Sequence, residues 1–157
     1  MGLKKRILSG LLIILLCSTS FFAITHQNGA IYGLTNAKGE DNCTHCHSYF
    51  PLITSGNYHD SISLTSRFTA NGYLPDSLYV VTISIGFKGI IKAGFQACFL
   101  DTNNNNAGVI VPAVGVQKLF DANYARLYAT HSADHNTGNG NTPMVWQFKW
   151  QAPPKNI

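Results

Sequence analysis

Two cysteines and a histidine in the segment Cys43-Thr44-His45-Cys46-His47 are the residues of this chain best placed to do chemistry. Their pattern, C-x-x-C-H, is the one on which haem is covalently attached in c-type haem proteins. Two thiols three positions apart can each add to a vinyl group on one porphyrin edge, and the histidine that follows can then bind the iron. We therefore expect Cys43 and Cys46 to hold one haem c through thioether bonds, with His47 as the proximal iron ligand.

Other uses of these three residues remain open. Cys43 and Cys46 could form a disulfide or a reactive dithiol, with His47 incidental. A C-x-x-C redox motif, however, normally opens a helix in a βαβ unit, and no such pattern surrounds this one. A zinc site could also use both cysteines with His45 or His47 and one distant histidine.

A second axial ligand to the iron would have to come from elsewhere in the chain. Our first candidate is His131, which ends a strand-like run, with Met144 and His135 as alternatives; the remaining histidines are His26, His45 and His59. A surface position at the end of a strand is the competing interpretation of His131. If the sixth position is filled, the protein carries electrons and is not an enzyme, whereas an open position would allow ligand sensing or peroxide chemistry.

The N-terminus predicts export. Basic residues at 4–6 precede an apolar run over 7–16, and small residues follow up to Ala23. This is typical of a secretory signal peptide over residues 1–23, because the apolar run is short for a membrane span. Lipidation at Cys17 and a retained membrane anchor are the alternatives. We expect the mature protein in the periplasm or at the cell surface.

Charge and cysteine content limit the partners of the mature chain. Without residues 1–23 it has 8 basic and 7 acidic side chains, a net charge of +1, and no basic run, which argues against nucleic acid as a partner. Cys98 is left without a partner if the other two cysteines hold haem. It lies in an apolar run, and we interpret it as a small buried hydrophobe.

The rest of the sequence predicts an all-β fold. Short alternating segments separated by turn residues indicate strands over 61–65, 78–85, 93–100, 108–111, 126–131 and 145–150, and a short helical turn over 115–125. Such a series is typical of an antiparallel, Ig-like β-sandwich. Trp146, Phe148 and Trp150 alternate, so we expect all three on the core face of one strand. Residues 24–55 show no apolar period and are predicted to be an irregular segment that bears the C-x-x-C-H motif, followed by the sandwich domain over 56–157.

Several segments resemble, in order, those of one family. Exported Bacteroidetes proteins with a reeler-like β-sandwich of the "choice-of-anchor V" type contain the patterns G-x-T-G-A-P-G-E-x-x-C-x-x-C-H, G-Y-x-P, G-F-Q, Y-x-x-H-T/S and W-x-F-x-W-x-A-P. The similar segments here are 33–47, 72–75, 94–96, 128–132 and 146–153. The resemblance implies a reeler-like sandwich, in which the histidine of the fourth pattern is His131.

The chain departs from this family in two places. Asn36 and Lys38 replace a glycine and a proline in the lead-in to the motif. Members of the family continue past the A-P pair with another strand, whereas this chain stops at Ile157. The sequence is therefore either a fragment or a chain whose last strand comes from another subunit, which would leave a sheet edge open for self-assembly.

We thus expect an exported mono-haem protein, similar to a c-type cytochrome, that transfers one electron to an unidentified redox partner protein. The alternative is a non-catalytic extracellular adhesion or assembly module. In that case the C-x-x-C-H segment would be a structural site with a metal or a disulfide.

Overall fold

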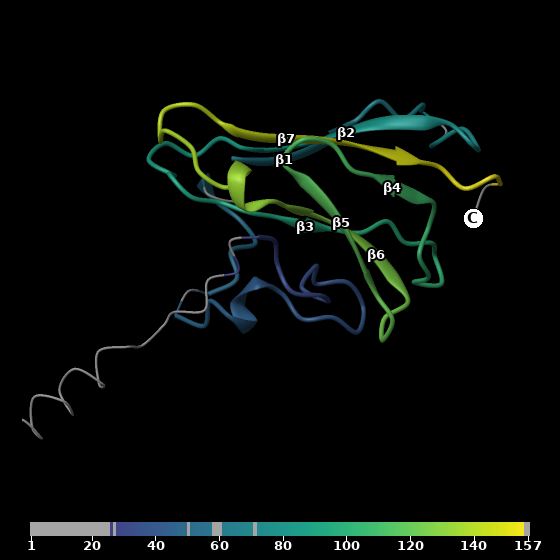
Figure 1. Ribbon diagram of the computed structural model, residues 1–157, viewed down its shortest axis with the longest axis horizontal. Coiled ribbons are helices and arrows are strands. Elements are labelled where there is room, and N and C mark those ends of the chain that lie inside the picture. Colours follow the sequence, from purple (N-terminus) through teal and green to yellow (C-terminus); the bar gives the residue numbers. More distant parts are fainter. Residues whose placement is uncertain (1–25, 27, 50, 58–60, 71, 156–157) are drawn as a thin grey trace, which may run out of the picture.

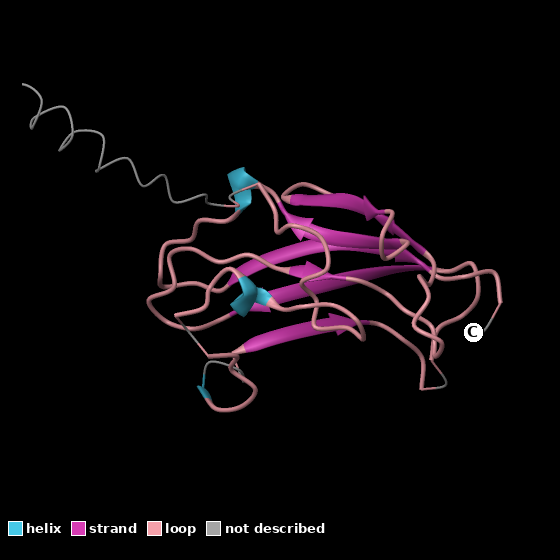
Figure 2. Cartoon of the chain, turned by 90° about the horizontal axis from the view of Figure 1, so that it is seen from below, coloured by secondary structure: helices cyan, strands magenta, loops and turns pink. Residues whose placement is uncertain are grey.

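Two antiparallel sheets face each other in the protein (Figure 1). The computed structural model describes residues 26, 28–49, 51–57, 61–70 and 72–155. The elements are η1 (Cys43–His45), β1 (Ile62–Ser66), β2 (Leu78–Ile85), β3 (Gln96–Ala97), β4 (Val109–Val111), β5 (Val116–Asp121), β6 (Arg126–His131), η2 (Ala133–His135) and β7 (Met144–Gln151). The two η elements are short 3₁₀ turns, and strands and loops make up most of the described chain in Figure 2. The predicted all-β sandwich is confirmed.

The strand order mixes neighbours in sequence with distant ones. One sheet has the order β1-β2-β7-β4, and the other has the order β3-β6-β5. β7 pairs along its whole length with β2, from Met144 opposite Ile85 to Gln151 opposite Leu78, and it also pairs with β4. One of the two central strands of the first sheet is therefore β7, the last strand among the described residues.

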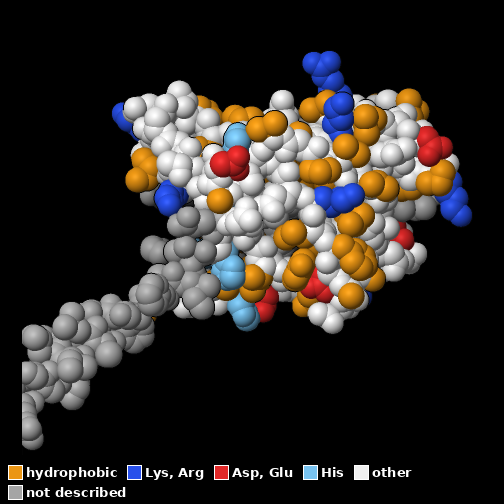
Figure 3. Space-filling model, in the orientation of Figure 1, with side chains coloured by type: hydrophobic (Ala, Val, Ile, Leu, Met, Phe, Trp, Pro, Cys, Tyr) orange, Lys and Arg blue, Asp and Glu red, His pale blue; other side chains and the backbone are white. Residues whose placement is uncertain are grey.

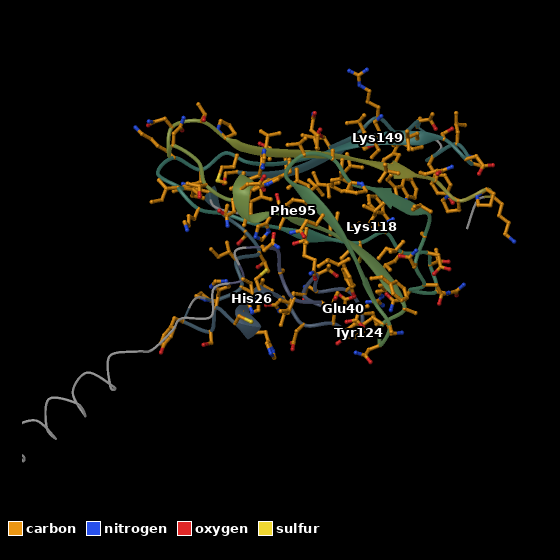
Figure 4. All side chains as sticks on the ribbon, in the orientation of Figure 1. His26, Glu40, Phe95, Lys118, Tyr124 and Lys149 are labelled. Carbon is orange, nitrogen blue, oxygen red and sulfur yellow. The ribbon has the colours of Figure 1, made fainter. Side chains whose placement is uncertain are left out.

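The core lies between the sheets and is dominated by β7. Trp146, Phe148 and Trp150 are 2%, 1% and 4% exposed, as their alternation predicts. The residues between them face solvent, and Figure 4 shows Lys149 on the outer side of its sheet. From the other sheet side, Phe99 stacks on Trp150 with ring centroids 4.7 Å apart. Full burial of an aromatic side chain stabilises the fold by roughly 1.5–3 kcal/mol.

The sequence-based expectation for residues 115–125 was wrong. Residues Val116–Asp121 form β5, which pairs in antiparallel register with β6 from Val116 opposite His131 to Asp121 opposite Arg126. Val116, Leu119 and Phe120 have the i, i+3, i+4 spacing of one helix face, which explains the error. Pairing with β6 satisfies the backbone of this segment and decides in favour of a strand.

The run over 93–100 pairs less than its apolar pattern predicts. Only Gln96 and Ala97 form ladder pairs, opposite Thr130 and Ala129 of β6. Phe95 and Phe99 nevertheless pack against the core cluster. The pattern thus predicted the burial of this run but not its short hydrogen-bonded length.

The N-terminal segment, residues 28–49, covers the outer face of the second sheet (Figure 1). Its backbone meets β6 where Ala30 N–H donates to Thr130 Oγ1 over 3.1 Å. The molecule therefore has a third, irregular layer packed on the sandwich. The predicted signal peptide over 1–23 lies outside the described residues, and no helix among those that are described is long and apolar enough to cross a membrane.

Candidate functional site

The C-x-x-C-H segment forms a compact turn. Cys43–His45 is the 3₁₀ turn η1, and Asn42 caps it because the Asn42 side-chain oxygen accepts from Thr44 N–H over 2.9 Å. His47 N–H donates to the Cys43 carbonyl over 3.0 Å. These bonds place the two cysteines on successive turns of backbone, with the histidine directly after them.

Both cysteines of the motif are exposed and free. The protein around the Cys43 thiol disfavours its charged form, which raises the pKa of Cys43; its own backbone N–H opposes this effect, and nearby Cys46 adds to it. The thiols are therefore accessible and available for covalent attachment.

A cavity of about 590 Å³ joins this turn to the sandwich. Cys43, Cys46 and His47 line it, and so does His131 from the end of β6. Cofactor and ligand pockets have volumes of about 300–1,000 Å³, so this cavity falls in their range. The rest of its lining consists of Ala30, Ile31, Leu34, Lys92, Ala93, Gly94, Phe95, Gln96, Asn136 and His26.

His131 is held tightly, at 8% exposure. Phe95 N–H donates to His131 Nδ1 over 3.1 Å, and the Phe95 carbonyl lies 3.3 Å from the same atom. While Nδ1 accepts from this N–H, the ring proton is on Nε2. In the other tautomer Nδ1 donates to the carbonyl and Nε2 keeps its lone pair, which is the usual arrangement for a metal-binding histidine. Gly94 packs flat against the ring, since a Cβ at this position would lie 2.2 Å from His131 Cε1.

The structure separates the other candidate ligands. Met144 lies in the core at 7% exposure, beside Gly138, and His135 packs on Gly115 and pairs with Asp134 over 3.2 Å. Neither is among the described residues that line the cavity.

The remaining histidines also differ in whether they line the cavity. His45 pairs with Asp41 over 2.8 Å at the surface, and His59 lies outside the described residues. His26 does line the cavity, and Figure 4 shows it on the same side of the sandwich as the N-terminal layer. Apart from His131, the described candidate for the second axial ligand that lines the cavity is therefore His26.

Sequence reasoning gave no role to Glu40, whose carboxylate is buried against β6. It pairs with Arg126 of β6 and accepts from Tyr128 Oη over 2.7 Å and from Thr35 Oγ1 over 2.6 Å. Glu40 and Arg126 are 86 positions apart, so no local pattern could have predicted the pair. The only available signal was the position of Glu40 within the lead-in pattern to the cysteines.

Cys98 lies beside this cluster, half-buried, with its sulfur 3.4 Å from Thr35 Oγ1. Burial raises the pKa of Cys98, although the hydrogen bond between Cys98 and Thr35 acts in the opposite direction. Its surroundings therefore keep the thiol protonated and unreactive near neutral pH.

In comparisons with known proteins, no family model, no curated protein and no solved structure matches this chain. Any functional assignment therefore depends on the residues of the site itself.

Those residues fit a covalently attached haem. Two accessible thiols and an adjacent imidazole border a cavity of suitable volume, whose walls include Ile31, Leu34 and Phe95. Within the described part of the chain, no group of three His, Cys, Asp or Glu side chains is arranged to hold a metal ion. Haem brings four iron ligands of its own and needs only the axial ones from the protein.

Proposed function

We propose that this protein is an exported mono-haem protein similar to a c-type cytochrome, and that it transfers single electrons in the periplasm or at the cell surface. The observation that carries the proposal is the cavity bordered by Cys43, Cys46, His47 and His131. These residues come from two separate layers, the N-terminal segment and the end of β6.

Each residue has a distinct part in this proposal. Cys43 and Cys46 would hold the porphyrin through thioether bonds, His47 would bind the iron, and His131 would complete its coordination. The Phe95 carbonyl would accept the Nδ1 proton of His131 and so orient the ring. Bound haem would supply an iron that gains and loses one electron, and apolar walls around it would limit water access, which tunes the potential.

The first test is co-expression of the chain with a c-type maturation system, followed by intact mass and visible spectra of the oxidised and reduced protein. We expect a mass gain of one haem and sharp α and β bands. A colourless product of unmodified mass would overturn the proposal, provided that a control cytochrome matures normally in the same cells.

The second test addresses His131 and uses His135 as a matched control. His131→Ala should retain covalent haem but lose the low-spin spectrum of a six-coordinate iron. His135→Ala should keep that spectrum, since His135 does not line the cavity. Unchanged spectra in both variants would exclude His131 as the sixth ligand, and His26→Ala would then be examined.

An assembly module is a second candidate function, and the edge strand β1 favours it. Ile62 and Leu64 are 55% and 58% exposed, although their partners in β2, Ile85 and Ile83, face the core side. An exposed apolar edge can accept a strand from a second copy of the chain. A concentration-dependent rise in mass by light scattering that Leu64→Lys abolishes would support this function, and a stable monomer at all concentrations would exclude it.

A further inference from the structure

Strand β6 contacts both sides of the candidate site. Tyr128 and Thr130, fully buried, contact the N-terminal segment through Glu40 and through Ala30 N–H. The strand then ends at His131, which lines the cavity. One strand thus holds the layer that contains the C-x-x-C-H motif and also presents the candidate second ligand.

Glu40 makes the most extensive of these contacts. Its carboxylate accepts from both the N–H and the hydroxyl of Thr35, within its own loop, and from Arg126 and Tyr128 of β6. Burial disfavours the charged form of Glu40, but these hydrogen bonds outweigh it and lower the pKa of Glu40. The carboxylate is therefore ionised near neutral pH.

The pair is sealed from solvent. The side chains of Glu40 and Arg126 are 0% and 5% exposed. Removing one member of such a pair leaves the other as a buried, uncompensated charge, which is strongly unfavourable. Arg126 also donates to the backbone carbonyl of Lys38 over 3.2 Å, so one guanidinium binds the loop before the cysteines at two residues, Lys38 and Glu40. A further donation, to the Asn104 carbonyl over 3.3 Å, ties the same guanidinium to the loop before β4.

Other contacts near the Glu40–Arg126 pair also hold the N-terminal segment on the sandwich. Gly33, at φ +72°, lets the Tyr124 ring approach so closely that a Cβ would lie 2.5 Å from it. Gln96 accepts from Leu34 N–H over 2.8 Å and donates to the Ile31 carbonyl over 2.7 Å. Figure 4 shows Tyr124, from the turn between β5 and β6, close to Glu40 of the N-terminal segment, on the side of the sandwich that also bears His26.

We propose that Glu40 is a positioning residue, which fixes the Cys43–His47 turn on β6 so that His47 and His131 face one cavity. The part that concerns iron ligation rests on the function proposed above, whereas the docking of the segment on β6 does not. Covalent attachment needs only the motif, but two-sided ligation needs the motif and the end of β6 in a fixed relation. Loss of the Glu40–Arg126 pair should therefore disturb ligation of the iron by both histidines while leaving covalent attachment of haem intact.

The docking can be measured without haem. Lys38 is the only Lys or Arg in residues 28–49, and its carbonyl accepts from Arg126, so trypsin can cut after it only when the loop opens. In the chain expressed without haem maturation, Glu40→Gln should accelerate this cleavage by about tenfold or more, because proteolysis follows the population of the open form. Asp41→Asn is the matched control: it removes a neighbouring carboxylate that pairs only with exposed His45 in the hydrogen bonds described, and it should cleave at the wild-type rate.

The ligation is measured in the haem-loaded protein. Glu40→Gln should keep the mass of one haem but show loss or mixing of the low-spin spectrum and a shifted midpoint potential, while Asp41→Asn keeps both. If the wild-type chain takes up no haem, the proposed function fails, and the cleavage after Lys38 still decides whether Glu40 docks the segment.

Cleavage and spectra of Glu40→Gln that match the wild type would overturn the inference. If Glu40→Gln does not fold, Tyr128→Phe removes a single donor to the same carboxylate and should move cleavage and spectrum in the same direction by smaller amounts. Wild-type behaviour of a folded Tyr128→Phe in both measurements would then count against the inference.

Discussion

Different interactions stabilise the sandwich core and hold the N-terminal segment on it. Between the sheets, alternate residues of β7 bury large aromatic rings against Phe95 and Phe99. In the segment, η1 has no buried residue, and docking depends on polar contacts such as Glu40–Arg126. Many apolar side chains are buried between the sheets, whereas in the segment the buried large apolar side chain is Leu34. We therefore expect the segment to open locally while the sandwich stays folded. The candidate site lies at the boundary between the two.

The largest expected effect breaks the segment's chemistry and leaves the core intact. Cys43→Ser with Cys46→Ser should abolish covalent haem completely, since no thioether can form. Because both cysteines are exposed, unfolding of the haem-free protein should change by no more than about 0.5 kcal/mol. Intact mass and thermal unfolding measure the two effects. Cys98→Ala is the control and should keep covalent haem, whereas covalent haem in the double serine variant would show that the motif cysteines are not the attachment points.

The next prediction breaks the core at a residue that does not line the cavity. Phe148→Ala should lower the free energy of unfolding by about 3–5 kcal/mol, because the ring is almost fully buried and its removal leaves a cavity. Lys149→Ala, its exposed neighbour on β7, should stay within about 0.5 kcal/mol of the wild type. Denaturant unfolding compares them, and equal losses would contradict the assignment of inner and outer faces.

A third substitution acts at the boundary. Gly94→Ala would place a Cβ against the His131 ring, so we expect a loss of about 1–3 kcal/mol from overpacking together with a changed spectrum of the haem-loaded protein. Gly86→Ala is the matched control, because the nearest atom to its Cβ, the Ser61 carbonyl oxygen, would be 3.6 Å away. If Gly94→Ala leaves the spectrum unchanged, the position of the His131 ring does not control ligation.

The smallest expected effect concerns pH. The pKa of Glu40 is lowered in the folded protein, so the unfolded chain binds the proton more readily, and the stability from this group is present above the ordinary value of 4.5. It should be lost as the pH falls below that value, and the segment should open before the sandwich unfolds. Cleavage after Lys38 by an acid-tolerant protease, or amide exchange at Thr35, would follow the opening. Glu40→Gln should show a flatter pH profile; a profile as steep as that of the wild type would assign the effect to other carboxyl groups.

The outcome of the strand predictions shows what local patterns can reveal. The alternation over residues 145–150 predicted both the strand and its buried face, because a strand has a side-chain period of two. Residues Val116–Asp121 were misassigned, since their apolar spacing also fits a helix and only pairing with β6 distinguishes the two. For His131 the sequence offered a strand-end histidine, while its relation to the cysteines could not be derived from spacing.

By itself the sequence determined the chemical groups of the candidate site and the class of the fold. The spacing of Cys43, Cys46 and His47 is a property of a few consecutive residues, and so is the alternation that forms strands. The tertiary structure alone decided that His131 shares a cavity with the motif, that Met144 and His135 do not line it, and that Glu40 of the segment pairs with Arg126 of β6. These relations join residues far apart in the chain, and they depend on which strands pair and which layer covers them, which no local pattern specifies.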